Sequence, residues 1–421
     1  MSTRQHVPVV IVGGGQAGLS VSYLLKQRGI EHLVFEACAA AHTWSTQRWD
    51  TFCLVTPNWQ CKLPGHPYDG PDPDGFMKKD EIIEYMKGFV AKVKPPIREG
   101  VAVMRVERQD NSVFSIETSD GDYTANEIVV ASGGYHTPII PRMAEKLPAT
   151  VTQIHSNQYR NPTQLPEGEV LVVGSGQSGA QIAEDLHLAG RKVHLAVGEA
   201  PRCARFYRGR DVVTWLADMG YYEMTIDNHP LRDGVRDNTN HYVTGRDGGR
   251  DIDLRRFATE GMKLYGVLED YEEGSLRFRN NLKHALDQAD RTYNGINAAI
   301  DKYIVENGIE APAQQHYTAI WEPDEPATRL SLAGPGIGSI VWCIGFTPDF
   351  RWLDASVFNG DGRPKHRRGV TNEAGVYFIG LPWLNTWGSG RFGAVGRDAE
   401  HIVQVIQKRL GMDRIALKVA V

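Results

Sequence analysis

The feature that most constrains the fold of this chain is a duplicated glycine motif. Two short apolar runs, residues 7–12 and 170–173, each lead into a turn with the spacing G-x-G-x-x-G. The first turn contains Gly13, Gly15 and Gly18, and the second contains Gly174, Gly176 and Gly179. A strand, such a turn and a helix form the phosphate-binding start of a βαβ unit. The sequence therefore predicts an α/β chain with two Rossmann-like dinucleotide-binding domains.

The first motif has the framing of a complete βαβ unit. Helical spacing follows it over residues 19–25, Gly29 ends that helix, and a second strand over residues 32–35 stops at Glu36. A carboxylate about 20 residues beyond the motif accepts hydrogen bonds from ribose hydroxyls, while the helix N-terminus offers N–H groups to a pyrophosphate. The predicted binding residues here are Gly13, Gly15, Gln16, Ala17, Gly18 and Glu36.

The second motif has no acid at the end of its second strand, where Ala196 and Val197 stand instead. Arginines follow soon after, and guanidinium groups without a carboxylate favour a ribose 2′-phosphate, hence NADPH over NADH. Glu199 argues against this assignment, and the arginines would also suit a solvated loop. The predicted binding residues here are Gly174, Gly176, Gln177, Ser178, Gly179, Arg202 and Arg205.

Two dinucleotide sites in one chain predict a redox enzyme. A flavin that is bound without a covalent bond needs a reductant, and a nicotinamide is the obvious partner. We therefore assign FAD to the first motif, which has the acid, and NADPH to the second.

The spacing of the motifs predicts an FAD domain into which the NADPH domain is inserted. The expected boundaries are 1–165 for the first part of the FAD domain, 166–345 for the NADPH domain and 346–421 for the rest of the FAD domain. Residues 101–108, 113–118 and 123–130 alternate as strands of a small antiparallel layer. A polar stretch at about 206–320, with one strong helix that Asn307 and Gly308 end, predicts a mixed helical insertion or cap on the NADPH domain.

Composition narrows the classes of partner. The formal net charge is only −5, which gives no electrostatic reason to expect nucleic acid or a membrane surface. The sequence has neither an apolar run long enough to span a bilayer nor a secretion signal at its start. Five scattered cysteines favour reduced thiols and hence a cytoplasmic protein. They form no CxxC pair and no metal-binding spacing, which argues against a thiol relay and predicts no metal site.

Beyond the two glycine motifs, several segments resemble the flavin-containing monooxygenases and their bacterial and plant relatives. They are the strand end Ala131, Ser132 and Gly133, the stretch 155–159 with His155 and Tyr159, the strand end 342–346 with Gly345, and the terminal stretch 376–383. The resemblance covers most of the chain outside roughly 206–320. Ala149 and Val151 stand where the family has Phe and Gly before its His.

The resemblance implies roles for further residues. Trp44 would lie along the flavin, and the backbone around Val103 would meet the adenine. Gly380 and Leu381 would meet the flavin pyrimidine and ribityl chain, followed by Asn385 and an aromatic segment beside the ring or in the core. Asn58 lies in a stretch similar to the active-site loop of the family, where its amide would contact the reduced oxygen species or the nicotinamide; otherwise it is a turn residue.

The family also implies an activity. We expect a monooxygenase in which NADPH reduces FAD and a C4a-(hydro)peroxyflavin oxygenates a small organic substrate with O₂. Three alternatives stay open: an NAD(P)H-dependent flavin oxidase or reductase, a Baeyer–Villiger enzyme, and a non-catalytic flavoprotein that senses redox state. A homodimer is the default expectation for the assembly.

Overall fold

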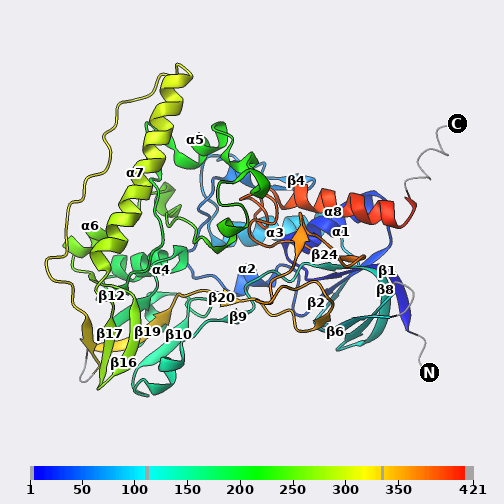
Figure 1. Ribbon diagram of the computed structural model, residues 1–421, viewed down its shortest axis with the longest axis horizontal. Helices are drawn as coiled ribbons and strands as arrows, with labels where there is room; N and C mark the ends of the chain where they lie inside the picture. The colour runs from blue at the N-terminus through cyan, green and yellow to red at the C-terminus, as the bar shows by residue number, and fades with distance from the viewer. Residues whose placement is uncertain (1–3, 110–112, 333–335, 413–421) are drawn as a thin grey trace.

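Two β-sheets, one mixed and one entirely parallel, lie side by side and organise this chain (Figure 1). The computed structural model describes residues 4–109, 113–332 and 336–412. The sheet near both termini lies at the right of Figure 1, and the sheet built from the middle of the chain lies at the left. This architecture confirms the predicted α/β class.

The first sheet is built around β1 (Gln5–Val12), which pairs in parallel with β2 (His32–Glu36) and β8 (Gly121–Val130). Next to β2 lies β5 (Ile97–Glu99), and next to β8 lies β24 (Val376–Phe378), both parallel as well. Because β24 comes from the end of the chain, the chain returns to its first sheet after building the second. The first domain is therefore made of two separate segments, as predicted.

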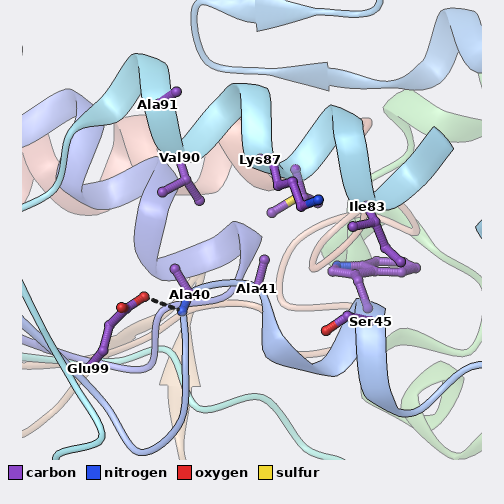
Figure 2. A pocket seen from close by; sticks show the side chains of 10 residues that line it. Ala40, Ala41, Ser45, Ile83, Lys87, Val90, Ala91 and Glu99 are labelled. Atoms are coloured by element: carbon purple, nitrogen blue, oxygen red, sulfur yellow. Dashed lines mark hydrogen bonds between the residues drawn. The ribbon is translucent and has the colours of Figure 1, made fainter. Parts of the chain in front are cut away.

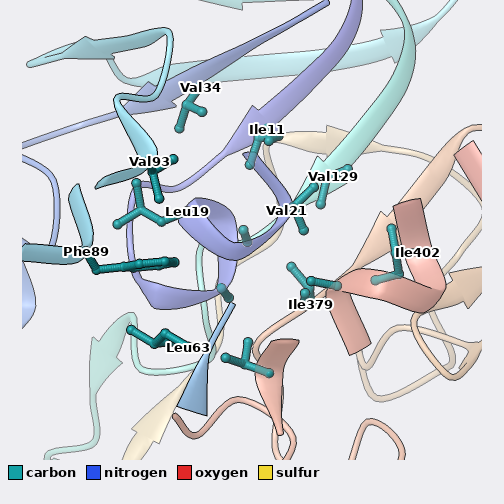
Figure 3. Packing of buried hydrophobic residues seen from close by; sticks show 14 of the residues in the cluster. Ile11, Leu19, Val21, Val34, Leu63, Phe89, Val93, Val129, Ile379 and Ile402 are labelled. Atoms are coloured by element: carbon teal, nitrogen blue, oxygen red, sulfur yellow. The ribbon is translucent and has the colours of Figure 1, made fainter. Parts of the chain in front are cut away.

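Three helices cover one face of the first sheet: α1 (Gln16–Gln27), α3 (Lys79–Val93) and α8 (Val395–Arg409). Figure 3 shows their apolar faces meeting the sheet, with Leu19 of α1, Phe89 of α3 and Ile402 of α8 around Ile11 and Val129. All five side chains are fully buried. This burial stabilises the domain and fixes the starts of α1 and α8 relative to the strand ends.

The predicted antiparallel layer is present. It consists of β6 (Val103–Arg108), β7 (Phe114–Thr118) and the first half of β8, with β7 in the middle. Because β8 is ten residues long, it belongs both to this layer and to the parallel sheet. A short strand, β21 (Leu353–Asp354), extends the layer beside β6.

The second sheet is entirely parallel, in the order β10-β19-β11-β12-β15. Its strands are β10 (Thr152–His155), β11 (Glu169–Val173), β12 (Val193–Ala196), β15 (Lys263–Tyr265) and β19 (Ile337–Trp342), with α4 (Gln177–Leu188) after β11. The predicted boundary at residue 166 splits this sheet, because β10 precedes it. The predicted insertion also overreaches, because β15 within it completes the sheet.

The insertion is a set of short elements around one long helix, α7 (Leu282–Glu306), which rises at the left of Figure 1. The predicted helix stop is confirmed, since Asn307 caps α7 and Gly308 has a φ of 61°. The other elements are β13 (Phe206–Tyr207), β14 (Arg210–Asp211), α5 (Val212–Asp218), α6 (Leu254–Thr259), β16 (Leu268–Glu272), β17 (Ser275–Phe278) and β18 (Arg329–Ser331). Four 3₁₀ turns complete it: η5 (Tyr221–Glu223), η6 (Ile226–Asn228), η7 (Arg232–Asp237) and η8 (Arg246–Gly248).

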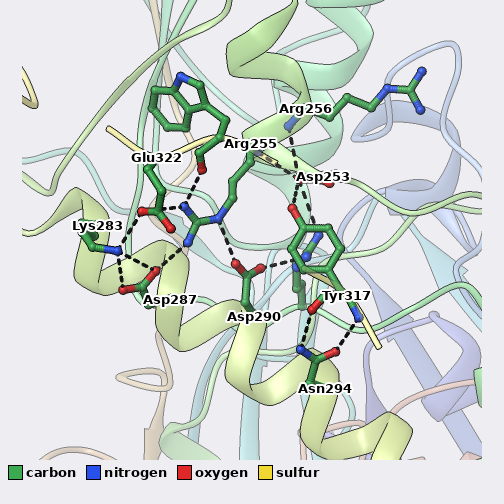
Figure 4. A network of polar contacts seen from close by, with 11 residues as sticks. Asp253, Arg255, Arg256, Lys283, Asp287, Asp290, Asn294, Tyr317 and Glu322 are labelled. Atoms are coloured by element: carbon green, nitrogen blue, oxygen red, sulfur yellow. Dashed lines mark hydrogen bonds and ion pairs between the residues drawn. The ribbon is translucent and has the colours of Figure 1, made fainter. Parts of the chain in front are cut away.

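A buried ionic network ties α6 to α7 (Figure 4). Arg255 of α6 is 2% exposed and donates to Asp287 at 2.6 Å and to Asp290 at 2.8 Å, both on α7. Arg202 approaches the same Asp290 at 2.8 Å. Removing one partner from such a network leaves a buried charge without compensation, so these contacts fix how the insertion packs on the second sheet.

The two passages between the sheets lie against each other. On the way out the chain forms β9 (Thr137–Pro138), on the way back it forms β20 (Phe346–Thr347), and the two strands pair antiparallel. No helix among the described residues is both long and apolar enough to span a membrane. The remaining elements are α2 (His42–Thr46), η1 (Asn58–Gln60), β3 (Lys62–Leu63), β4 (His66–Pro67), η3 (Arg142–Lys146), η4 (Pro162–Gln164), β22 (His366–Arg367) and β23 (Val370–Thr371).

Candidate functional site

The first glycine turn has the backbone geometry that dinucleotide binding needs. Gly13 has a φ of 115°, and a Cβ on it would lie 2.5 Å from the carbonyl oxygen of Ala131. A Cβ on Gly18 would overlap the carbonyl of Gly13. At Gly15, by contrast, the Cβ direction points into open space, with no atom within 4 Å. The turn therefore packs tightly on the strands below it and leaves room above Gly15 for a ligand.

Two unsatisfied groups at this turn fit a bound pyrophosphate and flavin. Helix α1 begins at Gly15, and no side chain caps it, so the N–H groups of its first turn have no partner inside the helix. The hydroxyl oxygen of Ser132, at the end of β8, is buried without a hydrogen-bond partner. Buried polar groups in folded proteins are normally satisfied, so both observations indicate a ligand that supplies acceptors here.

Glu36 lies beside this turn with its carboxylate oriented by the backbone. It accepts hydrogen bonds from the N–H of Gly14 at 2.7 Å and from the N–H of Cys38 at 2.9 Å. Its own carbonyl accepts from the N–H of Val101 at 3.0 Å, which brings the segment leading to Val103 alongside. Glu36, which the sequence analysis assigned to the ribose, thus lies close to the segment of Val103, which it assigned to the adenine.

Gln16 connects three of the predicted flavin-binding segments. Its side-chain oxygen accepts from the indole N–H of Trp44 at 3.2 Å, and its side-chain nitrogen donates to the carbonyl of Gly390 at 3.0 Å. Gly380 has a φ of 86°, and a Cβ on it would lie 2.9 Å from Cβ of Ala17. The structure thus brings the first motif, Trp44 and the loop after β24 to one place, as the family resemblance implied.

The other two residues predicted in the loop after β24 lie at its two sides. Leu381 lies beside Gly134, just beyond the Ser132–Gly133 strand end, with its Cδ2 3.7 Å from where a Cβ on Gly134 would be. Asn385 is held by its backbone: its N–H donates to Ser389 Oγ at 3.0 Å, and its carbonyl accepts from the N–H of Ile226 at 2.7 Å. The insertion therefore contacts this loop directly.

The second glycine turn repeats the first. Gly174 has a φ of 99°, and a Cβ on it would lie 2.7 Å from the carbonyl oxygen of Cys343, while a Cβ on Gly179 would overlap the carbonyl of Gly174. Helix α4 begins at Gly176 without a side-chain cap, so the N–H groups of its first turn, which includes Gln177 and Ser178, are free for phosphate.

Strand β19 of this sheet leads into Gly345, which the sequence analysis placed just after the end of the strand. Gly345 has a φ of 93°, and its carbonyl lies 3.1 Å from Nε2 of His155. The His155 ring thus ties the end of β10 to the segment that follows β19.

A cavity of about 450 Å³ opens at the carboxyl ends of the strands beside this second turn. Val173, Ala196 and Trp342, which end β11, β12 and β19, form its floor. Arg142 and Lys146 of η3 stand at its rim, and neither has an ion-pair partner in the described parts of the chain. Sequence reasoning missed both cations, because η3 precedes the second sheet and nothing local links it to the end of β12.

Arg202 and Arg205, the predicted 2′-phosphate ligands, do not face this cavity. Arg202 is 2% exposed and forms an ion pair with Asp290. It also stacks on Tyr317, with its guanidinium carbon 4.0 Å from the ring centre. Arg205 is 1% exposed and pairs with Asp211 at 2.6 Å. Both charges are neutralised inside the insertion, so the assignment of these two arginines to the phosphate was wrong.

Asn58 has a structural role. It is 4% exposed, its side-chain nitrogen donates to the carbonyl of Asp72 at 2.9 Å, and its side-chain oxygen accepts from the N–H of Met77 at 2.8 Å. Both ends of the amide are engaged by main chain, which clamps the segment between η1 and α3. This geometry does not support the predicted catalytic role, and it agrees with the alternative of a turn residue.

A second cavity, of about 310 Å³, lies between α2 and α3 (Figure 2). Its wall is mainly apolar and includes Ala41 and Trp44 from the α2 segment and Val90 from α3. Glu99 accepts from the N–H of Ala40 at 2.7 Å and so is engaged at the edge. No sequence pattern predicts this cavity, since its walls come from helices that periodicity alone does not place together.

The cysteines are reduced and, where buried, poorly nucleophilic. Desolvation raises the pKa of the Cys53 thiol to about 11 and that of the Cys61 thiol to about 12. It raises the pKa of Cys203 to about 12 and also raises that of Cys343. Since the thiolate is the reactive form, none of these four side chains is prepared for disulfide exchange.

Asp398, in the first turn of α8, is an unusual buried acid. It is 1% exposed, and one of its carboxylate oxygens has no hydrogen-bond partner. Burial raises the pKa of Asp398 to about 6, against a smaller opposing effect of its hydrogen bond with Ser389. Ser389 in turn accepts the N–H groups of Asn385 and Thr386. Asp398 therefore supports the loop that carries the predicted flavin contacts.

Comparison with known proteins finds a related oxidoreductase over almost the full length of the chain. Residues 10–218 match the family described as "Pyridine nucleotide-disulphide oxidoreductase". An uncharacterized CzcO-like oxidoreductase of Geobacillus kaustophilus is 31% identical over 409 residues, which cover 96% of this chain and 99% of that protein. The probable indole-3-pyruvate monooxygenase YUCCA4 of Arabidopsis thaliana is 30% identical over 200 residues, which cover 46% of this chain and 48% of that protein.

Solved structures share the fold over almost the full length. A flavin-containing monooxygenase from Stenotrophomonas maltophilia superposes with a TM-score of 0.65 at 17% identity, covering 96% of this chain and 99% of that one. OTEMO, in a complex with FAD and NADP, superposes with a TM-score of 0.56 at 15% identity, covering 96% of this chain and 86% of that one. The two-sheet arrangement is thus that of known two-dinucleotide flavoproteins.

The open space above Gly15 yields a test of the FAD site. Gly15→Ala adds a methyl group where no protein atom stands, at a φ of −78° that alanine adopts freely. We expect a folded protein whose affinity for FAD falls at least about tenfold, because the methyl group occupies the space that a pyrophosphate needs. Flavin titration of the apoprotein measures this. Gly295→Ala, also free of neighbours, is the control, and equal FAD affinity in Gly15→Ala would contradict the assignment.

The raised pKa of Asp398 yields a pH test. Because the folded-state pKa is about 6 and the ordinary value is 3.8, the unfolded chain releases this proton first as the pH rises. The free energy of unfolding therefore falls between about pH 4 and pH 6, by up to roughly 3 kcal/mol, and stays reduced above that window. Asp398→Asn removes this titration, so its stability should depend less on pH over the same window. Urea unfolding of the flavin-loaded proteins measures this, and parallel pH profiles would contradict it.

Proposed function

We propose that this chain, which belongs to the flavin-containing monooxygenase-like family and is a flavin-dependent oxidoreductase, is a monooxygenase. In this proposal it binds FAD at the first glycine turn and NADPH at the second, and it uses O₂ to oxygenate a small organic substrate. The observation that carries the proposal is the pair of equivalent turns at the carboxyl ends of β1 and β11, which are interior strands of two separate sheets. Each turn leads into a helix whose N-terminus has no side-chain cap.

The chemistry that bound FAD would supply is acceptance of a hydride from NADPH and transfer of one oxygen atom of O₂ to the substrate, with the other atom leaving as water. The residues of the chain bind, orient and shield. Gln16 and Glu36 hold the segments around the first turn, and the uncapped N-termini of α1 and α4 would donate their N–H groups to the two pyrophosphates. Reactions of this kind demand that water be kept from the flavin.

The insertion is the element that excludes water. Its η5 and η6 turns cover the loop after β24: the ring of Tyr222 lies 4.8 Å from that of Trp387, and the N–H of Ile226 donates to Asn385. Arg236 of η7 donates to the carbonyl of Trp383 at 3.2 Å. The insertion thus closes over the part of the loop where the flavin would bind.

The cysteine chemistry argues against the disulfide exchange named in the matched family. The four buried or half-buried thiols have raised pKa values, and the chain has no CxxC pair. An oxygenating reaction needs no side-chain nucleophile, in agreement with this lack. A flavin oxidase or reductase, a Baeyer–Villiger enzyme and a redox sensor remain the alternatives to be separated by experiment.

Rapid mixing with O₂ tests the proposal. The FAD-loaded protein is reduced anaerobically with NADPH and mixed with O₂ while the flavin spectrum is recorded. We expect NADPH to bleach the flavin, and O₂ to produce an absorbing species that differs from both reduced and oxidised flavin and decays slowly. Direct return to the oxidised spectrum would favour an oxidase. No bleaching by either NADPH or NADH would favour the sensor.

The choice of NADPH over NADH is supported by the cavity beside the second turn. Arg142 and Lys146 are cations at the rim of this cavity without ion-pair partners among the described residues. Two acids lie on the same rim: Glu269 is engaged by Arg279 at 3.0 Å, and Asp270 accepts the N–H of Tyr271 at 2.8 Å. Arg142 and Lys146 would supply the positive charge for a ribose 2′-phosphate, in place of the buried Arg202 and Arg205.

We expect the double variant Arg142→Ala, Lys146→Ala to bind NADPH about 10- to 100-fold more weakly, because each cation makes charge-assisted hydrogen bonds with the phosphate. Binding of NADH should change little. Titration of NADP⁺ and NAD⁺ against the flavin spectrum measures both. Lys192→Ala, an exposed cation just before β12 at the opposite edge of the sheet, is the matched control. Equal losses for both nucleotides would contradict the phosphate assignment.

A further inference from the structure

The loop between β24 and α8 carries an arginine, Arg391, in an unusual environment. Gln16 fixes the loop on one side through the carbonyl of Gly390, and Ile226 of the insertion fixes it on the other through Asn385. Arg391 therefore occupies a rigid position between the first glycine turn and the insertion.

The guanidinium of Arg391 has no acidic partner. It stacks on Trp387 with its carbon 4.0 Å from the ring centre, donates to Trp387's carbonyl, and donates to the side-chain oxygen of Asn240 at 2.9 Å. Among the described residues it forms no ion pair. The titratable groups that act on it are the phenols of Tyr135, Tyr222 and Tyr221, and burial lowers the pKa of Arg391.

Arg48, on which Tyr135 also acts, shows the same pattern of stacking without an acidic partner. Its guanidinium lies over Trp44 at 5.0 Å and over Phe52 at 5.3 Å, and its hydrogen bond goes to the carbonyl of Gln47 at 3.0 Å. Burial lowers the pKa of Arg48 too, and Tyr135 is the titratable group that acts on it. Trp44 in turn packs on Phe392, the residue after Arg391, with ring centres 5.1 Å apart. Two cations thus approach one region from two segments.

Three arginines among the described residues are almost fully buried, and each has an acidic partner. Arg205 has Asp211, Arg202 has Asp290, and Arg255 has Asp287 as well. Arg391 is less deeply placed, but its guanidinium is covered by Trp387 and has no counter-charge among the described residues. Partial removal of a cation from water without a counter-charge costs free energy, so an arginine held in this way is suited to an anion that a ligand supplies. Arg391 and Arg48 are both partly exposed, which means that a ligand can reach them.

The two dinucleotides do not account for Arg391. Their pyrophosphates have the helix N-termini at Gly15 and Gly176, each free of a side-chain cap. The contacts of Arg391 with Asn240 and Trp387 lie instead where the insertion meets the loop, beside Tyr222. This boundary separates the insertion from the segments that would hold the flavin.

We propose that Arg391 binds the carboxylate of the substrate, so that the enzyme acts on an organic anion whose apolar body lies against Trp387 and Tyr222. This inference rests on the proposed function and adds to it the chemical class of the substrate. Arg48 adds positive potential from the Trp44 side and favours the same charge. The aromatic walls suit a flat apolar group, since their rings offer large contact areas without competing charges.

The test uses 3-phenylpropanoate and its neutral analogue 3-phenylpropanamide as probes of the oxidised, FAD-loaded protein. Each probe is titrated while the flavin absorbance spectrum is recorded. We expect saturable binding of the carboxylate and binding of the amide at least about tenfold weaker. Arg391→Gln should weaken carboxylate binding about 10- to 100-fold and leave amide binding nearly unchanged. Arg397→Gln, which removes an exposed arginine paired with Glu223 six residues further on, is the matched control.

The outcomes separate this inference from the proposed function. Equal affinity for the two probes, no saturable binding of 3-phenylpropanoate, or an unaffected Arg391→Gln variant would each overturn it. Loss of FAD from Arg391→Gln, measured as flavin content after gel filtration, would assign the arginine to the flavin and overturn it as well. Reduction by NADPH and the reaction with O₂ do not need the carboxylate, so both should persist in Arg391→Gln, and their absence from the wild type would count against the proposed function alone.

Discussion

The close approach of backbone to backbone in the two glycine turns is the constraint on which the rest of the structure depends. Gly13 lies against Ala131, and Gly18 lies against Gly13, at distances that no side chain permits. The same packing recurs at Gly174 and Gly179. It directs α1 and α4 so that their uncapped N-termini face the strand ends, where phosphate binds. Each cofactor site is thus set by local backbone geometry, and the rest of the chain is arranged around it.

This local origin explains how much of the molecule could be predicted from the sequence. Glycine spacing, strand patterns and Glu36 act within a few dozen residues, and they correctly gave both turns, the antiparallel layer and the return of the chain to its first sheet. Arg202 finds its acidic partner Asp290 far along the chain, while Arg205 and Asn58 are engaged by residues 6 and 19 positions away, in segments without a periodic pattern. Sequence proximity to a strand end says little about where such long side chains find their counter-charge.

The insertion shows why the substrate side is harder to read than the cofactor side. Its short 3₁₀ turns have no periodicity that a sequence pattern reveals, yet they contact the loop after β24 through main-chain bonds and stacked rings. Its buried ionic network fixes these turns to the second sheet through α6 and α7. The loop after β24 is therefore supported by both domains, through Gln16 at Gly390 and through Ile226 at Asn385.

The pairing of β9 with β20 has a mechanical consequence. Two antiparallel strands that carry the chain between the sheets form a ribbon, and His155 ties its end through the carbonyl of Gly345. A ribbon bends easily about one axis, whereas twisting or stretching it breaks the bonds between its strands. Together with the contacts between the insertion and the loop after β24, this ribbon opposes relative movement of the two domains. A nicotinamide held on one sheet would thereby keep a constant position relative to a flavin held on the other.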